Sequence, residues 1–535
     1  MNGLTGTGSL IRLILRRDRL TLPAWTGLLA FVVIATAAGF AQLYPDPQGR
    51  QALAATVVGN PALLSLVGPL YDTSIGGLTA WRIGGIMALL VGLVSLIIVI
   101  RHTRTEEEAG RRELLGSTVV GRHAQLSAAL AMTCGANLAL AALVAAGLMG
   151  LGLPSSGSVA LGLSLAASGW MFTAVAGVTA QLAGSAGAAR GIAVIVLGLS
   201  FLLRVAGDGA GEGGRLAWLS WLSPIGWAQR VRPFAGESWW PFVLFIGSAL
   251  ALTATAYALS SRRDIGSGML PQRLGPATGS PGLRSPLALA WRLQRGGLIA
   301  WIAGFAVMGL VIGGVAQSLS EILRSAPQLE GLFARIGGQA ILIDAFFSTT
   351  MGLFALVASA YSVQAALRLR TEEEGQRAEP VLATSVGRLS WATSHLVFAV
   401  IGPAVLLAVV GLTAGLTYGL SIGDVGRDLP RVLAAGMVQL PAVWVLTGIA
   451  VALYGLLPRL ASLIWAALVV FLLLGQVGQM LQLSQWLLNM SPFTHVPAVL
   501  VGNVSLAPLV WLLGAAVLLT AAGLAGFRRR DVGRG

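Results

Sequence analysis

Lysine is absent from the sequence: all 35 basic residues of the 535-residue chain are arginines. The phosphate-binding loop G-x-x-x-x-G-K-[ST] requires a lysine, and so does Schiff-base catalysis. The chain can therefore supply neither. If ATP drives the protein through such a loop, the loop belongs to another chain.

Cysteine and histidine are scarce. The single cysteine, Cys134, excludes a disulfide framework and a thiolate metal cluster, and its apolar surroundings predict a small core residue. The four histidines are scattered without an H-E-x-x-H motif, and no G-x-S-G serine motif occurs in an apolar segment. We therefore expect no metal site and no catalytic residue, which disfavours an intramembrane enzyme.

Charged residues make up only 10% of the chain, whereas 56% of its residues are hydrophobic and its mean hydropathy is +0.80. So few charges cannot cover so much apolar surface in water, which predicts a membrane protein. A helix needs about 20 mostly apolar residues to cross the hydrocarbon core, and the chain offers six such segments in each half. The expected spans are residues 22–43, 78–100, 126–150, 159–184, 191–205, 241–259, 297–318, 345–367, 392–420, 432–457, 461–480 and 505–527.

Most arginines outside these spans lie on one side when both chain ends are placed in the cytoplasm. The positive-inside rule therefore predicts cytoplasmic termini in a multi-pass protein of the plasma membrane of the cell. Basic rims beside anionic lipid explain the formal net charge of +14. Membrane lipid, and no nucleic acid, is the partner that this charge predicts.

One polar segment occurs twice. RTEEEAGRRELLGSTVVGR begins at Arg104, and RTEEEGQRAEPVLATSVGR begins at Arg370, about half a chain length later. SRRDIG and RRRDVG end the sixth and twelfth spans, and LSPIGW and MSPFTH precede those spans. Because six spans per copy is an even number, we expect two parallel halves. The expected domains are residues 1–259 and 286–535, joined by a polar cytoplasmic linker at 260–285.

Each half begins with a basic amphipathic stretch, LIRLILRRDRL at residues 10–20 and PLALAWRLQRG at 286–296. Apolar residues on one face and arginines on the other suit a helix that lies in the cytoplasmic interface. Ordinary basic flanking residues would explain either stretch alone. Its occurrence in both halves favours an interfacial helix in each.

The repeated loops have helical signals. Thr105 and Thr371 each precede a glutamate by three residues, which is capping-box spacing, and i,i+4 pairs such as Glu107 with Arg111 would support a short, exposed helix. A solvated cap on the preceding span would explain one copy. The same charges in both copies, between apolar spans that diverged, favour docking of a cytoplasmic partner. The residues expected to take part are Arg104, Thr105, Glu106, Glu107, Glu108, Glu113, Arg122, Arg370, Thr371, Glu372, Glu373, Glu374, Glu379 and Arg388.

The pattern E-x-G-x-x-E-L-L at residues 108–115, with an amphipathic N-terminal helix and six spans per half, resembles the permeases of ABC-2 type ABC transporters. The doubled form is similar to actinobacterial exporters of polyketide antibiotics and other drugs, and the resemblance covers nearly the whole chain. It implies an all-α pseudo-dimer of the type V exporter kind with twelve transmembrane helices. The loop in that family is a coupling helix that sits in a groove on a separate ATPase. The second loop departs from the pattern at Gly375 and Pro380, which implies a shorter helix and unequal ATPase contacts.

The resemblance has further implications. It implies half-buried extracellular re-entrant helices in WLSWLSPIGW (218–227) and QWLLNMSPF (485–493). It also implies two copies of the ATPase for each permease chain, with ATP and Mg²⁺ bound by that partner and no cofactor bound by this chain. The implied function is export of drug-like, antibiotic or lipid-like compounds, with ATP hydrolysis on the partner.

A major-facilitator-type, proton-coupled drug transporter is the alternative, because it also has two parallel six-span halves. Proton coupling usually needs a carboxylate within the membrane. None of the 21 acidic residues falls in the middle of an expected span, although Asp344 lies close to one. This distribution favours energy supplied by another subunit.

The sequence restricts the chemical class of the substrate and the residues that could line its path. Without charges inside the spans, it should accept apolar or amphipathic small molecules. Aromatic and methionine side chains provide adaptable contacts, although lipid-facing packing would explain most of them individually. Following the resemblance, the candidates from the first, second and fifth spans of each half are Trp25, Phe31, Met87, Trp301, Phe305, Phe346, Phe347, Met351, Phe354, Trp465 and Phe471.

Overall fold

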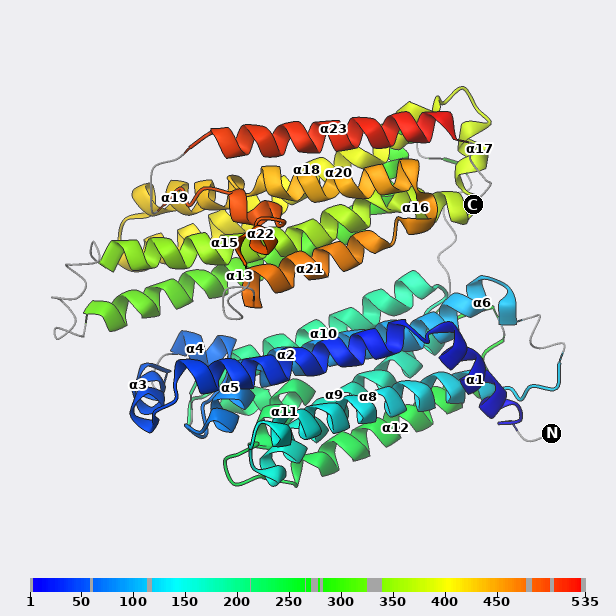
Figure 1. Ribbon diagram of the computed structural model, residues 1–535. Coiled ribbons are helices and arrows are strands. Elements are labelled where there is room, and N and C mark those ends of the chain that lie inside the picture. Colours follow the sequence, from blue (N-terminus) through cyan, green and yellow to red (C-terminus); the bar gives the residue numbers. More distant parts are fainter. Residues whose placement is uncertain are drawn as a thin grey trace. The chain divides into compact units, whose positions relative to one another are not determined.

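The computed structural model describes residues 3–57, 61–112, 118–211, 213–264, 266–270, 278–279, 282–324, 339–477, 484–500 and 505–530. Within these ranges all regular secondary structure is helical, and no strand is present. The chain divides into two compact units, Met1–Gly275 and Pro276–Gly535, and each is described by itself (Figure 1). The protein is a polytopic all-α membrane protein, as its composition predicts.

Unit 1 is built around the long helices α5, α8, α9 and α10. Serines cap the N-termini of two of them. Ser74 Oγ accepts a hydrogen bond from Gly77 N (3.0 Å) at the start of α5, and Ser185 Oγ accepts one from Ala188 N (3.1 Å) at the start of α10. The helices of unit 1 are α1 (Thr7–Arg17), α2 (Thr21–Leu43), α3 (Pro47–Val57), α4 (Pro61–Leu66), α5 (Ile75–Ile100), α6 (Glu106–Glu108), α8 (Ala124–Gly150), α9 (Ser155–Leu182), α10 (Ala186–Gly209), α11 (Pro224–Arg230) and α12 (Pro241–Arg262).

Unit 2 has the same order of long helices, with a hydrophobic core between α13, α15, α18 and α20. Short 3₁₀ segments lie at Pro458–Leu460 and Pro492–His495. The helices of unit 2 are α13 (Pro286–Arg324), α15 (Gln339–Ala366), α16 (Arg368–Glu374), α17 (Ala378–Leu382), α18 (Arg388–Ile422), α19 (Val425–Met437), α20 (Leu440–Leu456), α21 (Leu463–Val477), α22 (Gln485–Leu488) and α23 (Ala507–Arg529).

Eleven helices of the described residues are long and apolar enough to cross a membrane, and each overlaps one of the expected spans. The remaining expected span, 461–480, corresponds to α21, which is described over 15 residues. The last three residues of that expected span, 478–480, lie outside the described ranges. The multi-pass membrane topology is therefore confirmed, whereas the count of twelve spans in two equal halves stays a prediction.

The two N-terminal amphipathic stretches differ in structure. In unit 1 the expected separate helix is present as α1, whose Leu10 and Ile14 pack against the start of α8. The helix ends before Asp18. The buried carboxylate of Asp18 lies 2.6 Å from His102 Nε2 and 3.1 Å from Arg101. In unit 2 a separate helix was the wrong expectation, because α13 runs without interruption from Pro286 to Arg324.

Glycines let neighbouring helices touch backbone to backbone. A Cβ atom added to Gly455 of α20 would lie 1.8 Å from the carbonyl oxygen of Gly523 in α23, and one added to Gly523 would lie 2.4 Å from Val451 O. Small residues at helix contacts are the usual way to pack membrane helices closely, since lipid provides no hydrophobic drive for association. The last helix of unit 2 is thereby held against α20.

Candidate functional site

The first repeated loop continues the second span and does not begin a new helix. After α5 the chain passes through a π-helical turn, Arg101–Thr105, directly into α6. Thr105 therefore has helical backbone angles, and its side chain makes no cap hydrogen bond. Thr371 likewise lies inside α16. Both expected capping boxes are wrong, because a capping residue must precede the first helical turn and these threonines are preceded by helix.

The arginines that follow the glutamates pair with glutamates five residues earlier, in place of the expected i,i+4 pairs, although Arg370 and Glu374 form an i,i+4 pair at 2.6 Å. Arg112 lies 3.2 Å from Glu107, and Arg377 lies 2.7 Å from Glu372. The chain leaves the helix after the glutamates, where Gly110 has a φ of 69°. That left-handed turn carries the following arginines back toward the preceding turn of helix.

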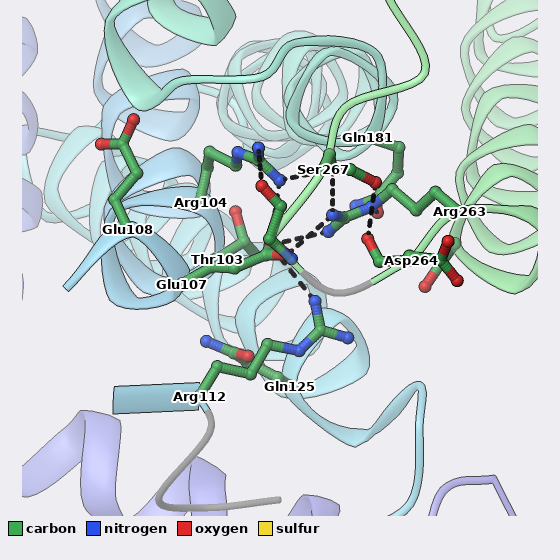
Figure 2. A network of polar contacts seen from close by, with 12 residues as sticks. Thr103, Arg104, Glu107, Glu108, Arg112, Gln125, Gln181, Arg263, Asp264 and Ser267 are labelled. Atoms are coloured by element: carbon green, nitrogen blue, oxygen red, sulfur yellow. Dashed lines mark hydrogen bonds and ion pairs between the residues drawn. The ribbon is translucent and has the colours of Figure 1, made fainter. Parts of the chain in front are cut away.

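Glu107 is the centre of a buried network in unit 1 (Figure 2). Arg263, just after α12, donates from Nη1 to Glu107 Oε1 and from Nη2 to Oε2, both at 2.7 Å. The backbone N–H of Gly266 donates to the same carboxylate at 2.7 Å, and Arg104 lies 3.3 Å from it. A carboxylate buried among several donors is stabilised in its charged form and fixes the groups around it.

Arg104 and Arg263 extend this network to other elements. Arg104 is 1% exposed, and it donates to the carbonyl oxygens of Gly184, between α9 and α10, and of Ser267 (3.0 Å). Arg263 also donates to Gln181 Oε1 in α9 at 2.7 Å. The loop is thus joined to the end of α9, to the segment between α9 and α10, and to the residues that follow α12.

A related ion pair recurs in unit 2 between the corresponding residues of the repeat, but it is half-buried and both of its contacts go to one carboxylate oxygen. Arg530 Nη2 lies 2.5 Å from Glu373 Oε2, and the hydroxyl group of Tyr454 donates to that oxygen at 2.7 Å. Glu373 occupies the place of Glu107 in the repeated loop, and Arg530 occupies the place of Arg263 in the repeated RRD segment. In each unit the loop is bound by the arginine that directly follows the last long helix. We call this contact the loop clamp.

The arginine of the repeated Val-Gly-Arg also has one role in both units. Arg122 Nη2 donates to the carbonyl oxygen of Arg263 at 2.8 Å, and Arg388 Nη1 donates to that of Arg530 at 2.9 Å. Each clamp arginine is therefore held through its side chain by the start of the loop and through its backbone by the end of the loop. Contacts within each unit therefore explain why both copies of the loop contain this arginine.

The expectation that the loop charges are solvent-exposed is only partly correct. Arg104, Glu107 and Glu372 are buried, and Glu113 lies outside the described residues. Glu108 is exposed, although its Oε1 accepts a hydrogen bond from Ala186 N (2.8 Å) at the start of α10. The loop residues with exposed positions are Glu108, Arg111, Arg122, Thr371, Glu374, Arg377, Glu379 and Arg388.

The loop prediction missed Arg263, Arg530 and Tyr454. The two arginines lie in SRRDIG and RRRDVG, so their recurrence was visible in the sequence as a feature of the last helices. Nothing in the sequence connected them with glutamates more than 150 positions earlier. Only folding brings the ends of these helices together with the loops.

The candidate path residues fall into two groups. Trp25, Phe31 and Trp465 are 40–45% exposed on their own units. Most others are packed in the cores: in unit 2, the Phe305 ring lies against those of Trp301 and Phe354, with centroids at 6.1 and 5.5 Å. The residues buried in this way are Met87, Phe305, Phe347, Met351 and Phe354, while Trp301, Phe346 and Phe471 are half-buried.

Ion pairs with buried carboxylates also lie at the helix ends remote from the loops. In unit 1, Arg204 is 0% exposed and donates to Asp208 (2.9 Å), Gln229 (3.0 Å) and the Leu66 carbonyl oxygen (2.9 Å). In unit 2, Asp344 lies 2.6 Å from Arg431. No group of three or more metal-ligating side chains occurs among the residues that the structure describes.

These features define a class: a multi-pass helical membrane protein whose two units each carry a polar loop clamped to their last helix. Comparison with known proteins identifies the family within that class. The family model described as "Multidrug efflux system permease Rv1217c, C-terminal domain" matches residues 283–528. The chain is 44% identical over 533 residues to the multidrug efflux system permease protein Rv1217c of Mycobacterium tuberculosis (strain ATCC 25618 / H37Rv), and the alignment covers 99% of this chain and 96% of that protein. The chain belongs to this family of permeases.

Proposed function

We propose that this chain is the membrane-spanning permease of an exporter driven by ATP hydrolysis on a separate ATPase subunit. Its substrates are apolar or amphipathic drug-like compounds, and its direction of transport is out of the cell. The relative's name, a multidrug efflux system permease, supports the substrate class and the direction. The resemblance to ABC-2 type permeases, and the absence of any lysine for a phosphate-binding loop, support an ATPase on another chain.

The observation that carries this proposal is the loop clamp, present once in each unit. Glu107 is bound by Arg263 in unit 1, and Glu373 is bound by Arg530 in unit 2. Separating the partners of a charge-assisted contact shielded from solvent leaves uncompensated charges, so the buried pair of unit 1 and the half-buried pair of unit 2 both resist separation. A force applied to either loop from the cytoplasm would therefore reach the last helix of that unit.

The exposed loop charges are the proposed docking surface for two ATPase copies. Glu374 and Glu379 in the second loop are exposed, as are Glu108 and Arg111 in the first. Charges at the rim of an interface set partner choice and association rate more than affinity. ATP and Mg²⁺ would be bound by the ATPase subunits. Glu107 and Glu373 are bound by different sets of residues within their units, so we include unequal contacts with the two ATPase copies in the proposal.

A proton-coupled secondary transporter is the alternative, with Asp344 as its coupling carboxylate. Two clamped loops have no evident purpose in that mechanism, whereas two ATPase copies would use one each. Efflux of a fluorescent apolar drug from cells that express the permease and its ATPase separates the two mechanisms. Replacing the catalytic glutamate of the ATPase by glutamine should stop efflux, and a protonophore should leave efflux intact while ATP stays high. Efflux that survives the glutamine variant and stops with the protonophore would establish the alternative, and Asp344→Asn would then abolish it.

A further inference from the structure

Unit 2 contains a cavity of about 250 Å³ between α15, the junction of α19 and α20, and the segment that follows α22. Ser348, Thr349 and Gly352 line it from α15, and Gln439 lines it from the start of α20. The opposite wall is apolar and is formed by Phe493, Val496, Pro497, Ala498 and Val499. No lining residue is charged, so the cavity suits a neutral molecule.

Two polar atoms in the wall have no hydrogen-bond partner within the described part of the chain: Gln439 Oε1 and Ser348 Oγ. Gln439 is 8% exposed, so its amide oxygen is shielded from solvent. A buried acceptor without a donor is unfavourable, and native proteins rarely keep one without a use. The oxygen is covered in this orientation, and the amide nitrogen is the atom nearer to Gly352 of the cavity wall. A ligand that carries a hydroxyl or N–H group would satisfy the oxygen once the terminal amide turns about its last side-chain bond, a torsion with a broad range, to face the cavity.

The corresponding place in unit 1 is filled. There the cavity between α5, α9 and α11 has a volume of about 20 Å³, lined by Trp81, Gly84 and Gln229 among others. Gln229 accepts a hydrogen bond from Arg204 and donates one to the Val67 carbonyl oxygen (2.7 Å). In the repeated segments LSPIGW and MSPFTH, the register that aligns the two Ser-Pro pairs places Pro497 where unit 1 has Gln229. The open cavity therefore belongs to unit 2 and is not a general feature of the duplicated fold.

We propose that this cavity of unit 2 is a binding pocket for a neutral, mainly apolar molecule that donates a hydrogen bond to Gln439. The proposal rests on the proposed function, because it assigns a substrate subsite of the exporter. Ser348 lies about 27 Å along α15 from Ala366, where that helix meets the loop, at a rise of about 1.5 Å per residue. The pocket is thus at the end of the helix remote from the proposed ATPase surface, where an exported compound would leave.

The binding test uses the full-length protein in lipid nanodiscs without any ATPase. The probes are 1-naphthol and its methyl ether, 1-methoxynaphthalene, which differ in the hydroxyl donor, with empty nanodiscs as the baseline for partition into lipid. The protein should bind 1-naphthol about threefold to tenfold more tightly, the range expected for one hydrogen bond. Gln439→Leu should abolish this preference by weakening 1-naphthol only. Gln364→Leu, an exposed site on the same helix as Ser348, is the matched control and should keep the preference.

A second variant tests the space rather than the hydrogen bond. A Cβ added at Gly352 would meet only the Gln439 side chain, at 3.8 Å, so Gly352→Val adds volume at the cavity wall from a position where its Cβ fits. It should weaken binding of both probes. Equal affinity of the unaltered protein for the two probes, a preference that survives Gln439→Leu, or unchanged binding in Gly352→Val would each overturn the pocket. None of these binding measurements needs ATP, so the two ideas can fail separately. If efflux is driven by ATP but the binding tests fail, only the pocket is rejected. If the binding tests succeed but efflux does not depend on ATP hydrolysis, only the proposed function is rejected.

Discussion

Glu107 and Arg263 are joined by two parallel hydrogen bonds of 2.7 Å, although 156 positions separate them in the sequence. Both side chains are buried, at 3% and 5% exposed. Paired N–H donors facing both carboxylate oxygens form the most directional ion pair available to proteins. Glu373 and Arg530 repeat the pairing in unit 2. The duplication has therefore kept a contact as well as a sequence.

Breaking the clamp in unit 1 should destabilise the protein. Removing one partner of a buried ion pair leaves the other charge uncompensated, which typically costs about 3–5 kcal/mol. Arg263→Gln and Glu107→Gln should each lower the thermal unfolding midpoint of the purified protein, and the double variant should lose less than the sum of the two. Arg262→Gln, the exposed neighbour, is the control. Additive losses would show that the two side chains do not depend on each other.

Charge reversal on the exposed acids of the second loop should affect coupling and leave folding intact. Exposed charges contribute only about 0–1 kcal/mol each, so Glu374→Arg with Glu379→Arg should leave the unfolding midpoint nearly unchanged. If a partner docks there, the variant should reduce substrate-stimulated ATP hydrolysis or association of the ATPase. Glu237→Arg, distant in sequence from both repeated loops, reverses one acidic charge elsewhere and is the control for each of the two single reversals. Normal ATP hydrolysis and normal efflux in the double variant would show that these acids are only solvated surface charges and do not dock a partner.

The burial of Glu107 changes what a broader substitution can test. Replacing Glu106, Glu107 and Glu108 together by alanine removes the centre of the unit 1 network along with the exposed Glu108. We expect that triple variant to lose stability, and its transport defect would not distinguish folding from docking. The exposed residues must be changed without Glu107.

The stoichiometry of the assembly follows from the number of loops. Two clamped loops on one chain predict one permease chain with two ATPase copies. Native mass spectrometry of the complex purified in detergent should show this ratio, and the Glu374→Arg, Glu379→Arg variant should shift it toward one ATPase copy. A complex with two permease chains would contradict the assignment of one loop to each ATPase.

The contact of α20 with α23 should depend on Gly523. A Cβ at this position would lie 2.4 Å from Val451 O, so Gly523→Ala must separate the two helices and should lower the unfolding midpoint. Gly514 of the same helix has nothing within 4 Å of an added Cβ. Gly514→Ala should therefore be neutral or slightly stabilising, since alanine favours helix over glycine by about 1 kcal/mol. Equal effects of the two changes would mean that the close approach does not matter for stability.

The sequence predicted the spans well, because the signal is local: each span is a run of apolar residues that must be helical to satisfy its backbone in lipid. The repeated segments were visible for a similar reason, since polar segments are conspicuous in an apolar chain. The short helix of each loop was predicted less well. Thr105 and Glu108 have the spacing of a cap, but the preceding span arrives already helical and continues through them.

By itself, the sequence determined the class of the protein, the helices and the repeat, because hydropathy and similarity act over neighbouring residues. The tertiary structure decided which loop charges are buried. Glu107 and Glu108 are adjacent in the chain and chemically identical, yet one is enclosed by Arg263 and the other faces outward. It also decided that the open cavity lies in unit 2, beside Gln439, and not in unit 1. Burial and cavity volume depend on the side chains that distant segments bring to one place, and no local pattern records them.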